Sequence, residues 1–471
     1  MRTQKDDLQH KIMTEESVKK LILRLGAPTT VGLMVISLYS LADAFFVSSL
    51  GTAAGAAVGV SFSIVALLQA VGYTLGLGAG SLMSRALGRK EEEQASAYAS
   101  LAFWLGLASG VLILTCGLLF LAPLMRFLGA NESIFPLALE YSRALFWAAP
   151  FTCGTFVLSQ LLRAEGRAVY SMLGLVCGGL LNIFLDPLFI TTLNMGVAGA
   201  SRATLISQAL SFSVLLSAYL TGHSKIRLFQ GFRSKSLSGI SSILITGLPS
   251  TARQGLIVLS TVLLNHAASS WSDAALSAIS VVTRLFLLAF GLCLGIGQGM
   301  MPVVGYNYGS GRYGRVREAY RFSTLLSSFL MLAVGIPMML FAPQLIAFFR
   351  DESEVIAIGA PALRAQSAVL VLHGLITCTI LLLQALGNSF FSTALASARQ
   401  GFFFVPLLFL LPSFFGIESI ILIQPLADAV TFLFAIPFAH HAYRQLKRKT
   451  AAEEKLSNRG ADSNQIFDLG K

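Results

Sequence analysis

Long apolar runs recur along the chain and are separated by short polar connections. Each run extends over about 20 residues or more, which is the length that a helix needs to cross the hydrocarbon core of a bilayer. The runs lie near residues 26–49, 55–83, 97–121, 138–161, 169–191, 199–220, 243–267, 275–304, 320–345, 362–385, 392–412 and 417–443. The pattern predicts an all-α integral membrane protein with twelve transmembrane helices.

The second half of the chain repeats the first at an offset of 221 residues. In this register Gly26 and Pro28 match Gly247 and Pro249, and the agreement continues as far as Gly166. Each repeat contains six crossings, an even number, so both halves begin on the same side of the membrane. We therefore expect two six-helix lobes related by a pseudo-two-fold axis along the membrane normal, with a binding site at their interface.

These patterns divide the chain into five parts. They are an N-terminal segment (1–25), a first lobe (26–220), an inter-lobe linker (221–242), a second lobe (243–443) and a C-terminal tail (444–471). The N-terminal segment is polar and mixed in charge, so we expect no cleavable signal peptide. The tail has no apolar periodicity after Lys449, and we expect it to be disordered.

Basic residues set the predicted orientation. Lys and Arg gather in the N-terminal segment, in the connections that follow the second, fourth, sixth and eighth helices, and in the tail. The opposite connections hold only Arg126 and Arg350. By the positive-inside rule both termini, the linker and the tail lie in the cytoplasm.

Composition agrees with a lipid-facing surface. Charged residues make up 12% and hydrophobic residues 55% of the 471 positions, whereas soluble domains carry about twice that charge. The net charge of +11 is spread over helix ends, so we expect no nucleic-acid partner. The five cysteines lie in apolar segments without close pairs, which argues against a disulfide framework and a metal site.

Ionisable residues inside a membrane are costly and are candidates for function. In the first lobe Asp43 lies in the first helix, roughly 9 Å below its outer end at about 1.5 Å per residue. Asp186 lies at a similar depth in the fifth helix, Asn182 is one turn deeper on the same face, and Thr204 lies near the start of the sixth. These depths predict one site in the outer half of the first lobe.

The chemistry of this site fits a small cation. Pro187 has no N–H, so the carbonyl of Ile183 loses its helical partner. Carboxylate, amide, hydroxyl and carbonyl oxygens suit a hard cation such as Na⁺, and a pair of carboxylates can equally carry a proton. Alternatively, Asn182 and Asp186 simply bond across a helix interface, and Thr204 bonds its own backbone.

Buried charges of the second lobe are mostly basic. They are Arg253, Arg284 and Arg399, with Asp428 as the one acid. The depths of Arg399 and Asp428 allow an ion pair, either as a structural link within the lobe or as part of a coupling network. Leu264 stands where the first lobe has its first-helix aspartate, so the carboxylate site is not duplicated.

Four segments resemble the multidrug and toxic compound extrusion (MATE) family, in its bacterial drug-exporting branch. They are Leu41-Ala42-Asp43 with Gly51 beyond it, Gly78-Ala79-Gly80-Ser81 leading to Leu87-Gly88, Asn182-x₃-Asp186-Pro187, and the run from Gly297 to Gly309. The resemblance covers about residues 15–445.

The resemblance implies a multi-pass transporter of the prokaryotic cell (inner) membrane that opens a V-shaped pair of lobes to either side in turn. Its members export small organic cations, mostly amphipathic drugs or toxic compounds, by antiport with Na⁺ or H⁺. It implies a cation site on Asp43, Asn182, Asp186 and Thr204. No enzymatic activity and no cofactor beyond the coupling ion are implied; we expect a monomer that contacts membrane lipids.

A coupling site known in other members uses second-lobe carboxylates of helices 7 and 10. This chain has Arg253, Asn265 and His373 in those helices and no acid, so we do not expect the second site.

Other readings remain open. A major facilitator transporter also has six plus six helices, but its loop signature requires an aspartate that the segment from Gly80 to Arg89 lacks. A flippase for lipid-linked oligosaccharides or lipids, from the same superfamily, would have a cationic central cavity, which the second-lobe arginines allow. An intramembrane enzyme using Asp43 and Asp186 as acid and base would leave a product, and no metal or protease motif supports it.

Overall fold

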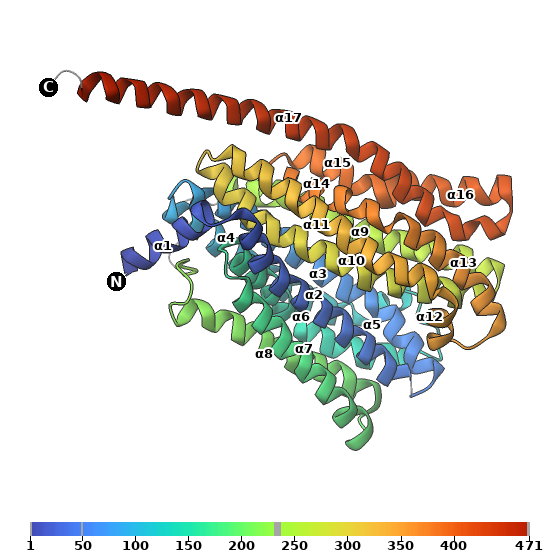
Figure 1. Ribbon diagram of the computed structural model, residues 1–471. Coiled ribbons are helices and arrows are strands. Elements are labelled where there is room, and N and C mark those ends of the chain that lie inside the picture. Colours follow the sequence, from blue (N-terminus) through green and yellow to red (C-terminus); the bar gives the residue numbers. More distant parts are fainter. Residues whose placement is uncertain (1, 49, 230–236, 469–471) are drawn as a thin grey trace.

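The computed structural model describes residues 2–48, 50–229 and 237–468. Within these residues the regular structure is entirely helical (Figure 1). This is the all-α class that the apolar runs predict, because a backbone in hydrocarbon must satisfy its hydrogen bonds within its own helix.

The first half of the chain forms a short N-terminal helix, α1 (Arg2–Glu15), and then the first lobe. The elements of this lobe are α2 (Val18–Ser48), α3 (Thr52–Gly88), α4 (Glu92–Leu119), α5 (Leu121–Phe127), α6 (Phe135–Ala164), α7 (Ala168–Pro187), the π-helical turn η1 (Leu188–Thr192) and α8 (Gly196–Leu220).

The second lobe follows the same plan but is interrupted more often. Its elements are α9 (Leu237–Trp271), α10 (Asp273–Gly309), α11 (Tyr313–Leu340), α12 (Ala342–Phe349), α13 (Ser353–Val369), η2 (Leu370–Leu372), α14 (His373–Leu386), α15 (Ser389–Ser397), η3 (Ala398–Phe403), α16 (Phe404–Phe415), η4 (Ile417–Ser419) and α17 (Ile420–Asp468).

The internal repeat is visible in the helix bounds. When the bounds of α3 and α4 are shifted by 221 residues, they coincide with those of α10 and α11, and the shifted α5 begins where α12 begins. The lobes differ where the second one is interrupted. A 3₁₀ turn, η2, separates α13 from α14, and a π-helical turn, η3, separates α15 from α16.

Among the described residues, eleven helical segments are long and apolar enough to cross a membrane. The twelfth long helix is α9, which occupies the place of the seventh predicted span. Its length of 35 residues is ample, but polar residues such as Arg253, Gln254 and Asn265 lower its hydropathy. With α9, the described residues contain the twelve long helical segments that the sequence predicts.

Two predicted boundaries need correction. The segment 1–25 is not a separate polar extension, because it contains α1 and the first turns of α2, where Val18 and Leu21 are buried. The predicted linker, 221–242, is shorter than expected because α9 already begins at Leu237. Residues 230–236 of that linker lie outside the described residues.

The prediction of a disordered tail is also wrong over the described residues. Helix α17 continues without a break to Asp468. Apolar periodicity is not needed for this, since Ala451, Ala452, Glu453, Glu454 and Lys455 are all strong helix formers.

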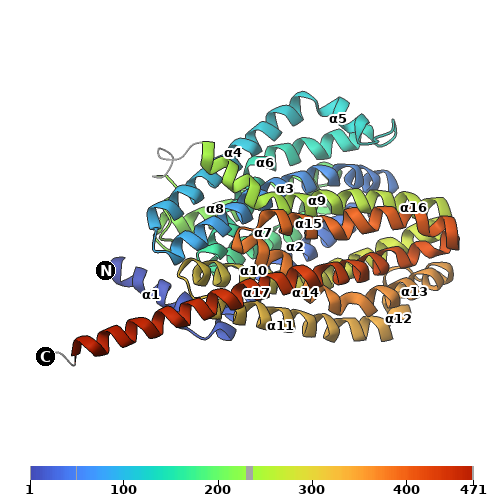
Figure 2. The same cartoon turned by 90° about the horizontal axis from the view of Figure 1, so that it is seen from above.

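Both chain termini lie at one end of the bundle, as Figures 1 and 2 show from perpendicular directions. We call this the terminal end. The short helices α5 and α12 lie at the other end, which we call the distal end. The connections that follow α3, α6 and α10, and the described part of the one that follows α8, lie at the terminal end, so the basic residues of these described connections gather there.

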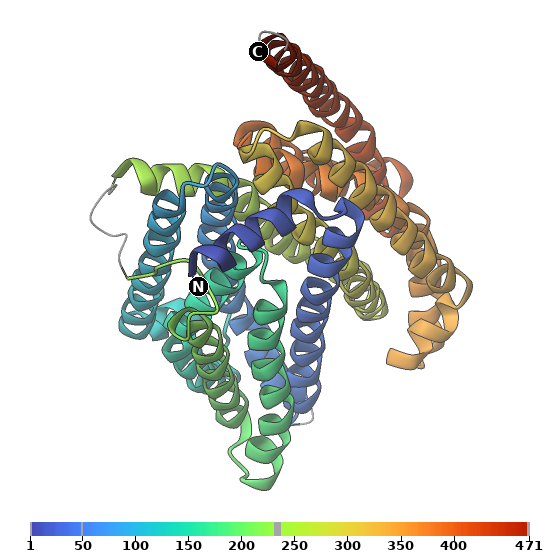
Figure 3. The same cartoon turned by 60° about the vertical axis from the view of Figure 1, so that its left-hand side comes forward.

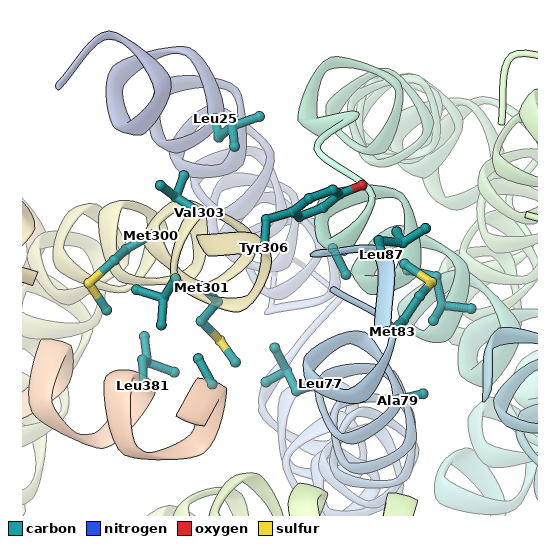
Figure 4. Packing of buried hydrophobic residues seen from close by; sticks show 14 of the residues in the cluster. Leu25, Leu77, Ala79, Met83, Leu87, Met300, Met301, Val303, Tyr306 and Leu381 are labelled. Atoms are coloured by element: carbon teal, nitrogen blue, oxygen red, sulfur yellow. The ribbon is translucent and has the colours of Figure 1, made fainter. Parts of the chain in front are cut away.

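The two lobes form separate groups of helices (Figure 3) and pack against each other through α2, α3, α9 and α10. Helix α3 packs against α9, and its repeat partner α10 packs against α2. One hydrophobic cluster joins the lobes, and Figure 4 shows Leu25, Leu77, Met301 and Leu381 from both lobes within it.

Two close backbone approaches between the lobes form a reciprocal pair. A Cβ built on Gly88 would lie 2.2 Å from the carbonyl oxygen of Tyr306, and one on Gly309 would lie 2.2 Å from that of Arg85. Gly309 and Tyr306 are the repeat equivalents of Gly88 and Arg85, so the two contacts are related by the pseudo-two-fold axis. The terminal half of the interface therefore requires glycine.

Candidate functional site

The four residues predicted for the first-lobe site do come together. Asp43 lies on α2, Asn182 and Asp186 on α7, and Thr204 on α8. Asp43 is five residues from the distal end of α2, roughly 8 Å along the helix axis. All four residues therefore belong to the distal half of the first lobe, as their predicted depths require.

Asn182 connects the members of this site. Its Nδ2 donates to Oδ1 of Asp186 over 3.3 Å and lies 3.5 Å from Oγ1 of Thr204. Asp186 is fully buried and Asn182 is 2% exposed. Asn182 and Asp186 thus bond to each other within α7 and not across a helix interface, and Asn182 reaches a second helix only through Thr204.

Asp43 approaches the same site from α2. Tyr141 of α6 donates its hydroxyl to Oδ2 of Asp43 over 3.2 Å. Asp43 lies within electrostatic range of Asp186, and Tyr141 lies within range of both carboxylates. Tyr141 is therefore a member of the site that the sequence analysis missed.

Three oxygens of the site are buried without a hydrogen-bond partner. They are Oδ1 of Asp43, Oδ1 of Asn182 and Oδ2 of Asp186. Burying such an acceptor without a donor costs free energy. A cation or a proton bound between them would remove that cost, and oxygen ligands are those that a hard cation prefers.

Local backbone irregularity accompanies the site. Helix α7 ends at Pro187, and the π-helical turn η1 follows at once. The hydroxyl of Thr191 donates to the carbonyl of Pro187. Departures from α-helical geometry of this kind are frequent at functional sites because they free backbone carbonyls.

A small cavity adjoins these residues on the side of α2, α7 and α8. Tyr39, Asn182, Thr204 and Gln208 are among the residues that line it. Nε2 of Gln208 lies 3.5 Å from the hydroxyl of Tyr39, while Oε1 of Gln208 is buried without a partner. Neither Tyr39 nor Gln208 was predicted from the sequence.

In the second lobe the predicted Arg399–Asp428 pair forms. Nε of Arg399 donates to Oδ1 of Asp428 over 2.6 Å. Gln366 and Gln424 donate to the same carboxylate over 2.8 and 3.0 Å. Asp428 is fully buried, and its charge is neutralised by a partner that also satisfies hydrogen bonds, as a buried ion pair requires.

Of the other two arginines predicted for the second-lobe network, one lies near Arg399 and the other does not. Arg253 lies within electrostatic range of Arg399, and the two arginines line one cavity in the second lobe. Arg284 is exposed, so its inclusion among the buried charges is wrong. Phe286 and Phe290 of the same helix, α10, lie against the Arg399 guanidinium. Among the described residues no group of three His, Cys, Asp or Glu side chains is arranged to hold a metal ion.

Comparison with known proteins decides the family. The MatE family model matches residues 28–188 and 249–410, one segment in each lobe and more than half of the chain. The chain belongs to the MatE family.

Relatives of this MatE chain are transporters. The multidrug export protein MepA of Staphylococcus aureus is 23% identical over 420 residues, which cover 89% of this chain and 93% of the relative. A multidrug resistance MATE family transporter in an outward-facing conformation has a TM-score of 0.87 at 29% identity, with coverage of 93% and 98%.

A third relative is a MOP superfamily transporter from Pyrococcus furiosus, described as having a binding pocket of reverse polarity. It has a TM-score of 0.87 at 28% identity and the same coverage. Membership of the MatE family excludes the major facilitator reading, and it agrees with the two-lobe architecture of the structure.

Proposed function

We propose that this MatE chain is a secondary active antiporter that exports amphipathic organic cations in exchange for Na⁺ or H⁺. The observation that carries the proposal is the group of three buried, unpartnered oxygens on Asp43, Asn182 and Asp186. Such a group is costly when nothing is bound, so it favours a site that gains and loses a cation in each cycle. The naming of a relative as a multidrug export protein supports the substrate class.

The proposed orientation follows from the basic residues at the terminal end. With this end in the cytoplasm of a prokaryotic cell, the positive-inside rule is satisfied and both termini are internal. The lobes pack together in the terminal half through bonds such as Thr74 to Thr251 and Ser81 to the carbonyl of Gln384. With the terminal end in the cytoplasm, lobes that pack together in this half would belong to an outward-facing state. We further propose that the transporter is a monomer with no cofactor other than the coupling ion.

The proposed coupling acts through α2. A cation or proton entering from the distal side neutralises Asp43 and Asp186 and removes their mutual repulsion. Because α2 carries Asp43 and also packs against α10 of the second lobe, a rearrangement of α2 changes the inter-lobe contact. The ion and the drug then favour different conformations of the transporter, so that binding of either one weakens binding of the other. One charge crossing 100 mV supplies about 2.3 kcal/mol for export.

The test is transport by the purified chain in liposomes, with an ethidium-type dye and separately imposed Na⁺ and pH gradients. We expect one gradient to drive the dye, and Asp43→Asn and Asp186→Asn to abolish the driven component. Glu140→Gln is the matched control, because Glu140 is an exposed acid on α6 next to Tyr141. Undiminished transport in both aspartate variants would refute the proposed site.

A further inference from the structure

A second cavity lies about midway along the helices of the second lobe and has no part in the proposed coupling. Arg253 of α9, Phe290 of α10, His373 of α14, and Arg399 and Gln400 of η3 are among the residues that line it. Two irregular turns shape it, since His373 directly follows the 3₁₀ turn η2 and Arg399 lies within the π-helical turn η3.

The charge of this cavity is positive. Asp428 accepts from Arg399, Gln366 and Gln424, lies 3.4 Å from Nε2 of His373, and is not among the lining residues. Within the described part of the chain, no acid lies at ion-pair distance from Arg253, whose charge faces that of Arg399. Two guanidinium groups and one carboxylate leave one positive charge uncompensated at membrane depth, where such a charge is costly.

The cavity also contains an unused donor. The Arg399 side chain is 9% exposed, and its Nη2 is buried without a hydrogen-bond partner although Nε is bound to Asp428. A guanidinium with a free second nitrogen can donate hydrogen bonds to an additional oxyanion, and such charge-assisted bonds are stronger than bonds between neutral groups. Arg399 is therefore bound to Asp428 through Nε, while Nη2 of the same side chain, which lines the cavity, has no partner.

The remaining walls are apolar. The Arg399 guanidinium carbon lies 4.8 Å from the ring centre of Phe286 and 5.5 Å from that of Phe290. Ile376 and Ile380 line the cavity from α14. A ligand that packs against the apolar side chains and also accepts a hydrogen bond from the free donor needs one anionic group attached to an apolar body.

We propose that this cavity binds the carboxylate or phosphate group of an amphipathic anion or zwitterion, with Arg253 and Arg399 as its cationic partners. The cavity borders the other lobe, because Arg253 lies on α9, which packs against α3. Bound there, the acidic group of a ligand lies next to the interface between the lobes. The inference does not depend on the first-lobe ion site, and binding can be measured without an ion gradient.

The test is equilibrium binding of dansyl-labelled undecanoic acid to the purified full chain in phosphatidylcholine nanodiscs, with empty discs as background. We expect saturable binding of the acid and at least about tenfold weaker binding of its uncharged methyl ester, because a hydrogen bond to a charged group is lost. Arg253→Gln weakens binding of the acid by about tenfold, and Arg253→Lys retains most of it.

Arg284→Gln is the matched control, since Arg284 is an exposed arginine on the neighbouring helix and is expected to bind the acid like wild type. A double variant, Arg399→Gln with Asp428→Asn, removes the second cation without leaving an unpaired acid, and it should also weaken binding. Thermal melting of each variant verifies folding.

Competition distinguishes the sources of the anion. If dodecyl phosphate and phosphatidylglycerol both displace the probe, the site accepts a lipid phosphate; displacement by dodecyl phosphate alone assigns it to a solute. Equal affinity for acid and ester, or equal affinity of Arg253→Gln and Arg284→Gln, would overturn the proposal.

Discussion

Arg163 of α6 donates a hydrogen bond from Nη1 to Oε1 of Gln298 on α10 over 2.7 Å, so a buried cation of the first lobe is held by an amide of the second. Its other nitrogens bind the carbonyl and hydroxyl of Ser159 within the first lobe. Arg163 is 3% and Gln298 2% exposed. A charge buried this deeply requires each of these partners, so the bond stabilises closure of the terminal half.

Gln298→Leu should therefore destabilise the protein. It leaves one Arg163 nitrogen buried without an acceptor, at a cost of about 1–3 kcal/mol. We expect a lower midpoint of thermal denaturation in detergent. Gln298→Glu restores an acceptor and should recover the midpoint, whereas equal losses in the two variants would show that the bond itself is unimportant.

The reciprocal glycine contacts make a second prediction. Gly88→Ala and Gly309→Ala each place a Cβ against a backbone carbonyl of the other lobe and should lower the melting temperature by similar amounts. The controls lie on the same helices. A Cβ on Gly59 of α3 or Gly291 of α10 meets nothing within 4 Å, so alanine there should stabilise by up to about 1 kcal/mol. Destabilisation in all four variants would indicate a general effect of alanine.

Helix α1 lies across both lobes at the terminal end. Nε2 of His10 lies 3.2 Å from the carbonyl oxygen of Gly88 in the first lobe. Toward the second lobe, Asn307 donates to the carbonyl of Met13 over 3.0 Å and Arg315 to that of Glu16 over 2.6 Å. A helix bound to both lobes resists their separation.

Deleting residues 2–16 should therefore promote opening at the terminal end. Ser84 of α3 is 1% exposed and lies against Gly305 of α10, so it reports on this interface. The exposed Cys116 and Cys177 are first replaced by alanine, so that they do not react with the label. We then expect a membrane-impermeant maleimide to modify Ser84→Cys about tenfold faster in the truncated chain. A tenfold change corresponds to about 1.4 kcal/mol less free energy favouring the closed terminal interface. Equal rates with and without the deletion would exclude this role for α1.

The hydroxyl of Thr204 offers a graded test of the first-lobe site. It lies 3.5 Å from Nδ2 of Asn182, and Thr204→Val replaces it with a methyl group of similar shape. We expect the driving-ion concentration for half-maximal transport to rise about tenfold, because one oxygen ligand is lost. Thr204→Ser keeps the hydroxyl and should stay within about twofold of wild type; a similar rise in both variants would point to packing rather than to ion binding.

Depth along a helix was enough to predict which first-lobe residues share a level of the bilayer. The depth of a residue is obtained by counting from a helix end that the sequence shows. This count places four residues of the first lobe at similar depths, and the structure brings them together: Asp43, Asn182, Asp186 and Thr204. Tyr141 was missed, since nothing in its spacing relates it to α2, and its place beside Asp43 follows from the packing of α6. The prediction that Arg284 is buried is wrong for a related reason. The sequence gives the depth of Arg284 in the bilayer, but it does not give the face of α10 on which the side chain lies.

By itself the sequence determined the class of protein, the twelve long helices, the repeat at 221 residues and the polar residues that lie within the bilayer. Those properties follow from the length and composition of local segments, because hydrocarbon forces each crossing to satisfy its own backbone. Only the tertiary structure decided which charges meet and which donors stay free, as for Arg399 and Asp428. The rotation of one helix against another depends on packing over the whole bundle, and no spacing within a single helix records it.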